Sequence, residues 1–302
     1  MIKEIQALVE GDTIVIITPA KSIDSKFIDS AVTLFKSWGL KVEVGEYAKG
    51  NHYYFSGTDD ERVADLQWAL NHPKAKAIFC SRGGYGTIKI VEEVDYSMFI
   101  ENPKWLIGFS DVTVLHNKIH SSFELPSIHG MAALNIDKLN KNSRSFQTLK
   151  NCLFGKMESY SFPFGTYNRK GDAKGTLTGG NLAILESLIG TTLDICTDGK
   201  ILFIEEIGEH AYKVERMLWS LKKAGKFDKL KGLIVGQLTN IEGSEAFYGK
   251  PIEEVIYNVV SEFEFPVAFN FPAGHELENE SVVLGKTCQL NVSVTESKLT
   301  YL

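Results

Sequence analysis

The stretch AKAIFCSRGGYG, residues 75–86, joins a short apolar run to a glycine-rich turn. Residues 75–80 have the length and composition of a buried β-strand, and three glycines lie within 83–86. A buried strand of this kind is typical of a parallel sheet covered by helices on both faces. The segments on either side of 75–86 decide whether such a sheet is present.

Strand-like and helix-like segments alternate on both sides of this turn. β-branched or alternating runs predict strands, and apolar residues at helical spacing predict the helices between them. The expected elements are a strand at Thr13–Thr18, a helix at Ser25–Trp38, a strand at Lys41–Gly45, a helix at Asp59–Asn71 and, after the turn, a helix and a strand at Trp105–Ile107. This order predicts an α/β fold whose N-terminal domain is a parallel sheet flanked by helices.

The regular pattern lapses over residues 156–174, which are polar, aromatic and rich in turn residues. We therefore expect an α/β domain at 1–155, a linker at 156–174 and a C-terminal domain at 175–302. Helix-like and strand-like segments resume after the linker, and the chain ends in two alternating runs, Cys288–Val294 and Lys298–Leu302. These runs predict a terminal hairpin in a mixed α/β domain that is rich in strands at its end.

Composition excludes several classes of protein. The 302 residues include 32 Lys+Arg and 38 Asp+Glu, a net charge of −6 without a basic tract, which argues against nucleic acid or an anionic membrane as the main partner. The four cysteines are scattered without a CxxC pair, which indicates neither a disulfide framework nor a zinc site. No apolar run approaches the ~18 residues of a membrane span, and no secretory signal pattern is present. We expect a soluble, cytoplasmic protein.

The most pointed local feature is the segment WLIGFSDV, residues 105–112. A buried strand ends at Gly108, Ser110 follows, and an amphipathic helix begins at once. This is the setting of a nucleophile elbow, in which a sharp strand-to-helix turn presents a serine hydroxyl. Val112 stands where the usual motif has glycine, and the alternative is that Ser110 simply caps the helix with Asp111 beside it.

The glycine-rich turn after the strand at 75–80 suggests an anion-binding loop. Its glycines allow a close approach of backbone amides to an oxyanion or a substrate carboxylate. Arg82 is suited to bind a carboxylate with two parallel hydrogen bonds. The alternatives are a tight turn without a ligand and an Arg82 held in a structural ion pair.

A nucleophilic serine needs a base, and the base needs a group that orients it. His275 lies in a loop directly after a strand-like run, and the alternative is a surface histidine. Glu205 follows the apolar run 201–204, where a charge is costly without a partner, and the alternative is a strand-end carboxylate in water. His116 and His120 have a zinc-ligand spacing without the accompanying glutamate, so we expect them on a solvated helix face.

The sequence resembles the muropeptide L,D-carboxypeptidase family, which also includes the microcin-C self-immunity peptidases. The resemblance extends from Gly11 to about Gln289 and rests on six short motifs in family order. The motifs are Gly57-Thr58-Asp59 with Arg62 and Asp65, Arg82-Gly83-Gly84-Tyr85-Gly86, Gly108-Phe109-Ser110-Asp111, Gly179-Gly180-Asn181-Leu182, Phe203-Ile204-Glu205-Glu206 and Pro272-Ala273-Gly274-His275. Each is weak alone, and together they are specific.

The resemblance implies a serine peptidase that removes a C-terminal D-alanine from muropeptide tetrapeptides, without a metal or an organic cofactor, and as a homodimer. It implies specific roles for the matching residues: Ser110 as nucleophile, His275 as base, Glu205 as its orienting carboxylate, the amides of Gly84 and Asp111 as the oxyanion hole, and Arg82, Gly83 and Tyr85 in binding the peptide. Two alternatives remain. One is a peptidase that cleaves peptidyl-nucleotide antibiotics, and the other is a non-catalytic protein that binds cell-wall peptides.

Overall fold

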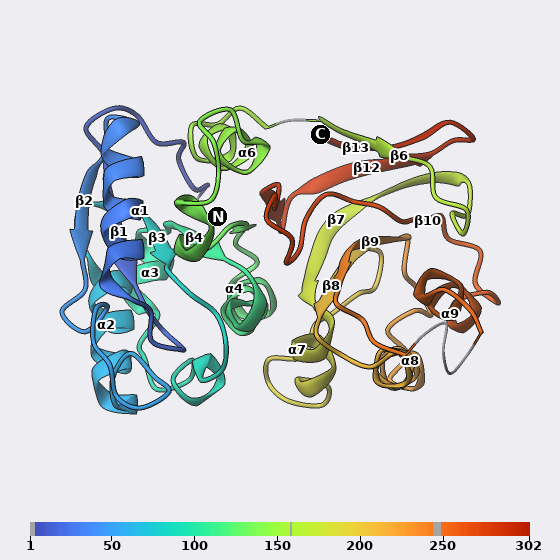
Figure 1. Ribbon diagram of the computed structural model, residues 1–302, viewed down its shortest axis with the longest axis horizontal. Coiled ribbons are helices and arrows are strands. Elements are labelled where there is room, and N and C mark those ends of the chain that lie inside the picture. The colour runs from blue at the N-terminus through green and yellow to red at the C-terminus, as the bar shows by residue number, and fades with distance from the viewer. Residues whose placement is uncertain (1–3, 158, 244–248) are drawn as a thin grey trace. The chain divides into compact units, whose positions relative to one another are not determined.

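The computed structural model describes residues 4–157, 159–243 and 249–302. The chain divides into two compact units (Figure 1). The first contains residues 1–156 and 280–283, and the second contains residues 157–279 and 284–302. Each unit is built around its own sheet.

The sheet of the first unit has six strands in the order β11-β5-β4-β3-β1-β2. The pairs from β2 to β5 are all parallel, as the alternation of strands and helices predicts. The strands are β1 (Thr13–Ile17), β2 (Lys41–Val44), β3 (Ala75–Cys80), β4 (Trp105–Gly108), β5 (Ser127–His129) and β11 (Val282–Leu284). The strand order reverses between β1 and β3, and open α/β sheets bind ligands at the carboxyl ends of strands at such a point.

Helices cover this sheet, and Figure 1 shows α1 running alongside β1 and β2. The helices are α1 (Ser25–Ser37), α2 (Asp59–Asn71), α3 (Ser97–Glu101), α4 (Thr113–Phe123), α5 (Ala133–Ile136) and α6 (Arg144–Leu153). In α1 the buried residues Ile28, Ala31 and Phe35 recur every three or four positions, so one stripe of the helix packs inward. Phe35 meets Phe79 of β3 with a ring-centroid distance of 5.0 Å, which attaches α1 to the middle of the sheet.

The second unit contains a seven-stranded sheet in the order β10-β9-β8-β7-β12-β13-β6. Its strands are β6 (Ser159–Pro163), β7 (Gly171–Asn181), β8 (Ile201–Ile207), β9 (Gly232–Thr239), β10 (Val267–Ala268), β12 (Thr287–Val292) and β13 (Glu296–Tyr301). The pairs from β10 to β7 are parallel, and the pairs from β7 to β6 are antiparallel. The sheet is therefore mixed, as the sequence predicts for this domain.

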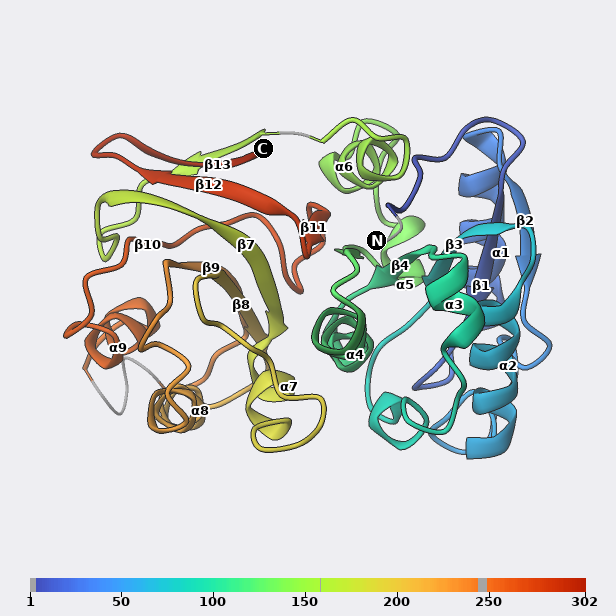
Figure 2. The same ribbon diagram turned by 180° about the vertical axis from the view of Figure 1, so that it is seen from behind.

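Three helices pack on the parallel half of this sheet: α7 (Leu182–Ser187), α8 (Ala211–Lys223) and α9 (Ile252–Val259). Figures 1 and 2 both show them on the side away from β6, β12 and β13. Their apolar faces form one buried cluster with β8 and β9, including Leu202, Val214, Leu233 and Ile256. This cluster is the core that supports β8, the strand that carries Glu205.

The strands β12 and β13 form the predicted terminal hairpin, which is confirmed. Within the range 156–174, residues 159–163 form β6 on β13, and β7 begins at Gly171. The buried side chains of β6 alternate with exposed ones, and its partner strand lies more than a hundred residues later. Among the described residues, no helix is both long enough and apolar enough to cross a membrane.

Candidate active site

Ser110 lies in a strained turn between β4 and α4. Its φ angle is 62°, in the left-handed region that residues other than glycine and asparagine rarely adopt. A single 3₁₀ turn, Ser110–Val112, connects the strand to α4. The residues at the two N-cap positions are Phe109 and Val112, and neither makes a side-chain capping bond. Ser110 therefore lies in a sharp, strained strand-to-helix turn, as the sequence predicts, and the interpretation of Ser110 as a helix cap is wrong.

The glycine-rich loop packs directly against this turn. A Cβ atom on Gly83 would lie 2.9 Å from Cβ of Ser110, 3.1 Å from the carbonyl oxygen of Phe109 and 3.2 Å from the amide nitrogen of Asp111. Real Cβ atoms do not approach other atoms so closely, so the contact requires glycine at this position. The neighbouring Gly84 is exposed and has a φ of 113°. Thus the glycine-rich loop and the serine turn pack closely together within the first unit.

Arg82 and Tyr85 flank the glycines of this loop. The guanidinium of Arg82 is half-buried and donates from Nη1 to the carbonyl oxygen of Ser22 at 2.6 Å. Burial lowers the pKa of Arg82. Tyr85 is 52 % exposed, and its ring lies 6.1 Å from that of Phe55 between centroids. Arg82 is fixed by a backbone carbonyl, while Tyr85 faces solvent.

The carboxylate of Asp111 has a role in this turn that the sequence did not reveal. Oδ2 accepts hydrogen bonds from the amide and the hydroxyl of Thr87, at 2.9 and 2.6 Å. Asp111 is only 2 % exposed, and burial raises its pKa, while the bonds from Thr87 and the positive charge of Arg62 act in the opposite direction. The carboxylate therefore connects the serine turn to the end of the glycine-rich loop. Its partner lies 24 residues earlier, so no local pattern signals the contact.

In the second unit, His275 and Glu205 form a close pair. Nδ1 of His275 donates to Oε2 of Glu205 at 2.6 Å, because the carboxylate can only accept. The side chain of His275 is 12 % exposed and that of Glu205 is fully buried. The alternatives of a surface histidine and of a carboxylate in water are therefore wrong. A buried carboxylate that holds an imidazole is the usual orienting arrangement of a general base.

A bulge in β9 holds the loop that carries this histidine. The pairing of β8 with β9 shifts after Ile204, where Gly236 and Gln237 face a single residue of β8. A Cβ on Gly236 would lie 2.3 Å from the carbonyl oxygen of Ala273, so only glycine allows the loop to approach. The amide of Gln237 donates to that oxygen at 2.9 Å.

The side chain of Gln237 also tethers the loop on the far side of His275. Its Oε1 accepts from the amide of Glu276 at 2.8 Å, and its Nε2 donates to the carbonyl oxygen of Glu278 at 2.7 Å. Gln237 therefore holds the histidine loop at three points. Sequence reasoning did not single out this residue, because its partners lie about forty positions along the chain.

The expectation that His116 and His120 lie on a solvated helix face is wrong. His116 is fully buried, and its Nε2 donates to the carbonyl oxygen of Gly108 at 2.9 Å. The hydroxyl of Ser127 lies 2.7 Å from Nδ1 of His116 and 3.0 Å from Nε2 of His120. Burial lowers the pKa of His116 to about 3, so the ring is neutral. Among the residues that the structure describes, no group of three His, Cys, Asp or Glu is placed to hold a metal ion.

Comparisons with known proteins identify the family of this chain. Residues 14–130 match the LD-carboxypeptidase N-terminal domain, and residues 174–290 match the LD-carboxypeptidase C-terminal domain. The chain belongs to the LD-carboxypeptidase family. Members of this family are peptidases, so the protein is a hydrolase of peptides.

Relatives in this family align with nearly the whole chain. A probable murein peptide carboxypeptidase of Bacillus subtilis is 34 % identical over 293 residues, which cover 95 % of this chain and 91 % of the relative. The murein tetrapeptide carboxypeptidase of Pseudomonas aeruginosa is 28 % identical, with 92 % of each chain covered. The N-terminal and C-terminal domains of the family are therefore both present in this chain.

Two solved structures share the fold of this chain. The muramoyltetrapeptide carboxypeptidase from Oxalobacter formigenes superimposes with a TM-score of 0.87 at 26 % identity, covering 96 % of this chain and 98 % of the other. The microcin C7 self-immunity protein MccF gives a TM-score of 0.85 at 23 % identity, with 97 % of each chain covered. At that identity, the likeness to MccF shows a common fold.

Proposed function

We propose that this family member is a serine-type L,D-carboxypeptidase that removes the C-terminal D-alanine from muropeptide tetrapeptides. The observation that carries the proposal is the 2.6 Å bond from His275 to the fully buried Glu205, in a chain that also presents Ser110 on a strained turn. The names of the relatives from Pseudomonas and Oxalobacter support the substrate class.

In the proposed reaction, Nε2 of His275 takes the proton of the Ser110 hydroxyl as Oγ attacks the scissile carbonyl carbon. Glu205 stabilises the imidazolium that forms. The tetrahedral intermediate collapses when the C–N bond breaks, and Nε2 returns the proton to the departing D-alanine amine. Water then attacks the acyl-enzyme ester by the same route, which releases the shortened peptide and restores the serine. The step requires Nε2 of His275 to reach Oγ of Ser110 in the working enzyme.

The glycine-rich loop supplies the remaining groups of the proposed site. Backbone amides of Gly84 and Asp111 would stabilise the oxyanion, and such preorganised donors contribute a large part of catalysis in acyl transfer. The guanidinium of Arg82 keeps donors beyond the one used by Ser22, and these would bind the terminal carboxylate of the substrate. Gly83 and Tyr85 would form the wall beside the peptide.

The test is mass spectrometry of a muropeptide tetrapeptide ending in D-alanine after incubation with the wild type and with Ser110→Ala. Loss of one alanine with the wild type only is the expected result. A tetrapeptide ending in L-alanine serves as the control for stereochemistry, and it should stay intact. His210→Ala removes a solvent-exposed histidine that also lies near a carboxylate, at 3.7 Å from Glu242, and it should retain activity where His275→Ala does not.

Other outcomes would favour the alternatives. A wild type that leaves the tetrapeptide intact but hydrolyses a peptidyl nucleotide at Ser110 would be an immunity-type peptidase. A wild type that binds the tetrapeptide without cleaving it or the nucleotide would be a binding protein. Either result contradicts the proposed reaction.

We also propose that the enzyme is cytoplasmic and that it acts on cell-wall peptides recovered by the cell. We further propose that it forms a homodimer. All four cysteines are free thiols, and three of them are buried, which fits a reducing compartment. Sedimentation of the purified protein measures the oligomeric state, with a dimer of this 33.6 kDa chain as the expected species.

A further inference from the structure

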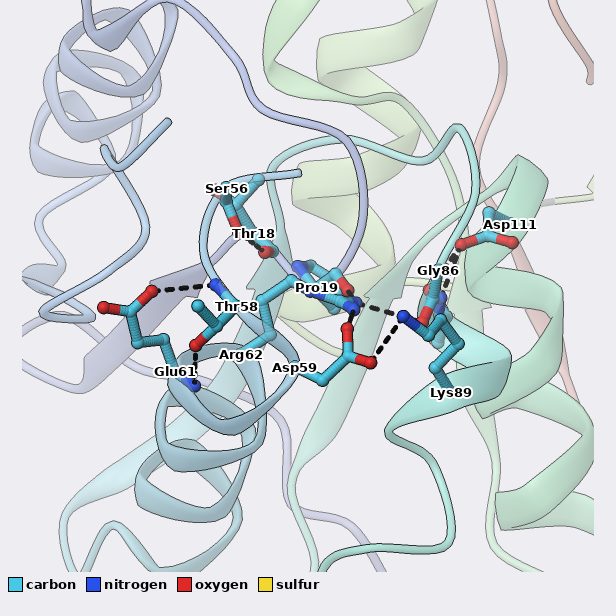
Figure 3. Close-up of polar contacts among 11 residues, drawn as sticks. Thr18, Pro19, Ser56, Thr58, Asp59, Glu61, Arg62, Gly86, Lys89 and Asp111 are labelled. Carbon is cyan, nitrogen blue, oxygen red and sulfur yellow. Dashed lines mark hydrogen bonds and ion pairs between the residues drawn. The ribbon is translucent and has the colours of Figure 1, made fainter. Parts of the chain in front are cut away.

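Arg62 is almost fully buried in the first unit, with 1 % of its surface exposed. A buried guanidinium is costly unless its donors are satisfied and its charge is balanced. Figure 3 shows it between Asp59 and two backbone carbonyls. Nη1 donates to the oxygen of Pro19 at 2.6 Å and to the oxygen of Gly86 at 3.0 Å, and Nη2 pairs with Oδ1 of Asp59.

The start of α2 fixes the position of this side chain. Thr58 caps the helix in a reciprocal capping box, in which its hydroxyl accepts from the amide of Glu61 at 3.2 Å and its own amide donates to Oε2 of Glu61 at 2.8 Å. The guanidinium of Arg62 lies over the ring of Phe55, with Cζ 4.7 Å from the ring centroid. Lys89 pairs with the other oxygen of Asp59. The position of Arg62 is thus set by its helix, by a ring and by a carboxylate.

One peptide unit of the glycine-rich loop is held from both sides. The carbonyl of Gly86 accepts from Arg62 at 3.0 Å, and the amide of Thr87, which belongs to the same peptide plane, donates to Asp111 at 2.9 Å. Gly86 has a φ of 127°, and a Cβ there would lie 2.8 Å from the ring of Phe55 and 3.0 Å from Nη1 of Arg62. The peptide is therefore clamped between a cation and a carboxylate in a conformation that requires glycine.

The clamp, in which Arg62 and Asp111 hold the Gly86–Thr87 peptide from opposite sides, connects Arg62 to the serine turn. Asp111 follows Ser110 directly, and its carboxylate accepts hydrogen bonds from both the amide and the hydroxyl of Thr87. Rotation of the Gly86–Thr87 peptide would release that carboxylate and move the loop that packs on Ser110. Arg62 and Lys89 both pair with Asp59, and the positive charge of Arg62 also acts to lower the pKa of Asp111.

We propose that Arg62 is a positioning residue for the reaction: it holds the Gly86–Thr87 peptide, and through Asp111 it sets the orientation of the amides at Ser110 and in the glycine-rich loop. The inference rests on the proposed function, in which these amides bind the oxyanion. Arg62 itself has no contact with the substrate in this account, so its loss should affect the rate of the chemical steps more than peptide binding.

The experiment compares Arg62→Ala with Arg169→Ala in the full-length protein. Arg169 is a matched control, because its guanidinium also donates to backbone carbonyls, those of Val260, Phe263 and Phe265, and lies 5.2 Å from the ring of Tyr257 in the second unit. Two rates are measured for each folded variant: release of D-alanine, and labelling of Ser110 by a fluorophosphonate.

For Arg62→Ala we expect kcat to fall about 10- to 100-fold with KM changed less than about 3-fold, the scale expected for misplaced catalytic groups. Labelling of Ser110 should slow in parallel. Methylguanidinium at millimolar concentration should restore part of both rates in this variant, because it can occupy the vacated cavity. It should not accelerate the wild type or Arg169→Ala, whose kcat stays near that of the wild type.

If Arg62→Ala does not fold, Thr87→Val tests the other end of the clamp, since it removes the hydroxyl bond to Asp111 at nearly constant volume. Its kcat should also fall at nearly constant KM. An unchanged kcat in folded Arg62→Ala or in folded Thr87→Val, or a fall of equal size in Arg169→Ala, overturns the inference.

The labelling rate keeps this inference separate from the proposed function. A wild type that is labelled at Ser110 but leaves the tetrapeptide intact contradicts the proposed substrate. The role of Arg62 is then tested by comparing the labelling rates of Arg62→Ala, Arg169→Ala and the wild type. A wild type that is neither active nor labelled contradicts both proposals.

Discussion

The two units contribute to the proposed site in different ways. In the first unit, the important features belong to the backbone: Ser110 at a φ of 62°, and Gly83 with no room for a Cβ atom. In the second unit, the important feature is a charge, the fully buried carboxylate of Glu205 bonded to His275. Ser110 follows the carboxyl end of β4, and Glu205 lies in the second half of β8. Both strands belong to parallel pairs.

This difference determines which kind of substitution should disrupt the features of each unit. A backbone geometry is disturbed by added volume, even a methyl group, because the surrounding atoms are already in contact. A buried ion pair is disturbed by loss of charge at constant volume, because the partner is left without electrostatic stabilisation. The two halves can therefore be tested by opposite kinds of substitution.

The largest expected effect is that of Glu205→Gln in the second unit. The amide keeps the size of the carboxylate but cannot stabilise the imidazolium, and its NH₂ group favours the wrong tautomer of His275. We expect kcat for D-alanine release to fall about 10³- to 10⁴-fold, by analogy with the loss of the orienting carboxylate in serine proteases. Steady-state kinetics measure the effect.

Glu242→Gln is the control for this prediction, because Glu242 lies near His210 in a solvent-exposed pair of the same unit. Its activity should match that of the wild type. A Glu205→Gln enzyme with more than about a tenth of the wild-type kcat would show that the charge of Glu205 does not act in catalysis.

An intermediate effect is expected for Gly83→Ala in the first unit. The added Cβ would lie 2.9 Å from Cβ of Ser110, so the loop and the serine turn must move apart. Such a displacement should lower kcat about 100-fold. Gly232→Ala is the control, because the Cβ there would meet the side-chain atoms of Leu290 at 3.2 Å and of Ala173 at 3.4 Å, away from the site. Equal kinetics for the two variants would contradict the close packing on Ser110.

The smallest effect concerns stability rather than activity. The pKa of His116 is lowered from 6.5 to about 3 by burial. Between these values the unfolded chain binds a proton that the folded chain does not. The free energy of unfolding therefore falls as the pH drops below about 6.5, by up to about 1.4 kcal/mol per pH unit from this residue. Above pH 6.5 the ring is neutral in both states and has no such effect.

His116→Gln should remove this pH dependence, and denaturant titrations between pH 7 and pH 4 measure it. The variant should lose less stability on acidification than the wild type does. The control is His52→Gln, which replaces an exposed histidine of the same unit and should follow the wild type. An equal loss in His116→Gln and the wild type would contradict a neutral, buried His116.

The sequence was sufficient to predict the elements that depend on local pattern. The helix at Asp59–Asn71 has the predicted bounds, and β3 occupies Ala75–Cys80 as expected. Both are marked by short-range signals: the capping residues of the helix, and an apolar run that ends in glycines. The strand-to-helix turn at Ser110 was predicted for the same reason.

Features that depend on distant partners were not predictable. The helix α4 contains polar residues that suggest a solvated face, yet His116 is buried because Gly108 and Ser127 satisfy both of its ring nitrogens. Strand β6 lies in a segment that looks like a linker, because it needs β13 as its partner. The role of Arg62 likewise depends on carbonyls 43 and 24 positions away.

The most direct test of the account is the site of covalent labelling. A fluorophosphonate reacts with an activated serine, and mass spectrometry of the digested protein locates the adduct. We predict a single adduct on Ser110 in the wild type, strongly slowed in His275→Ala and unaffected in His210→Ala. An adduct on another residue, or labelling of Ser110 at an equal rate in His275→Ala, would contradict the claim that the strained serine and the buried His–Glu pair act together.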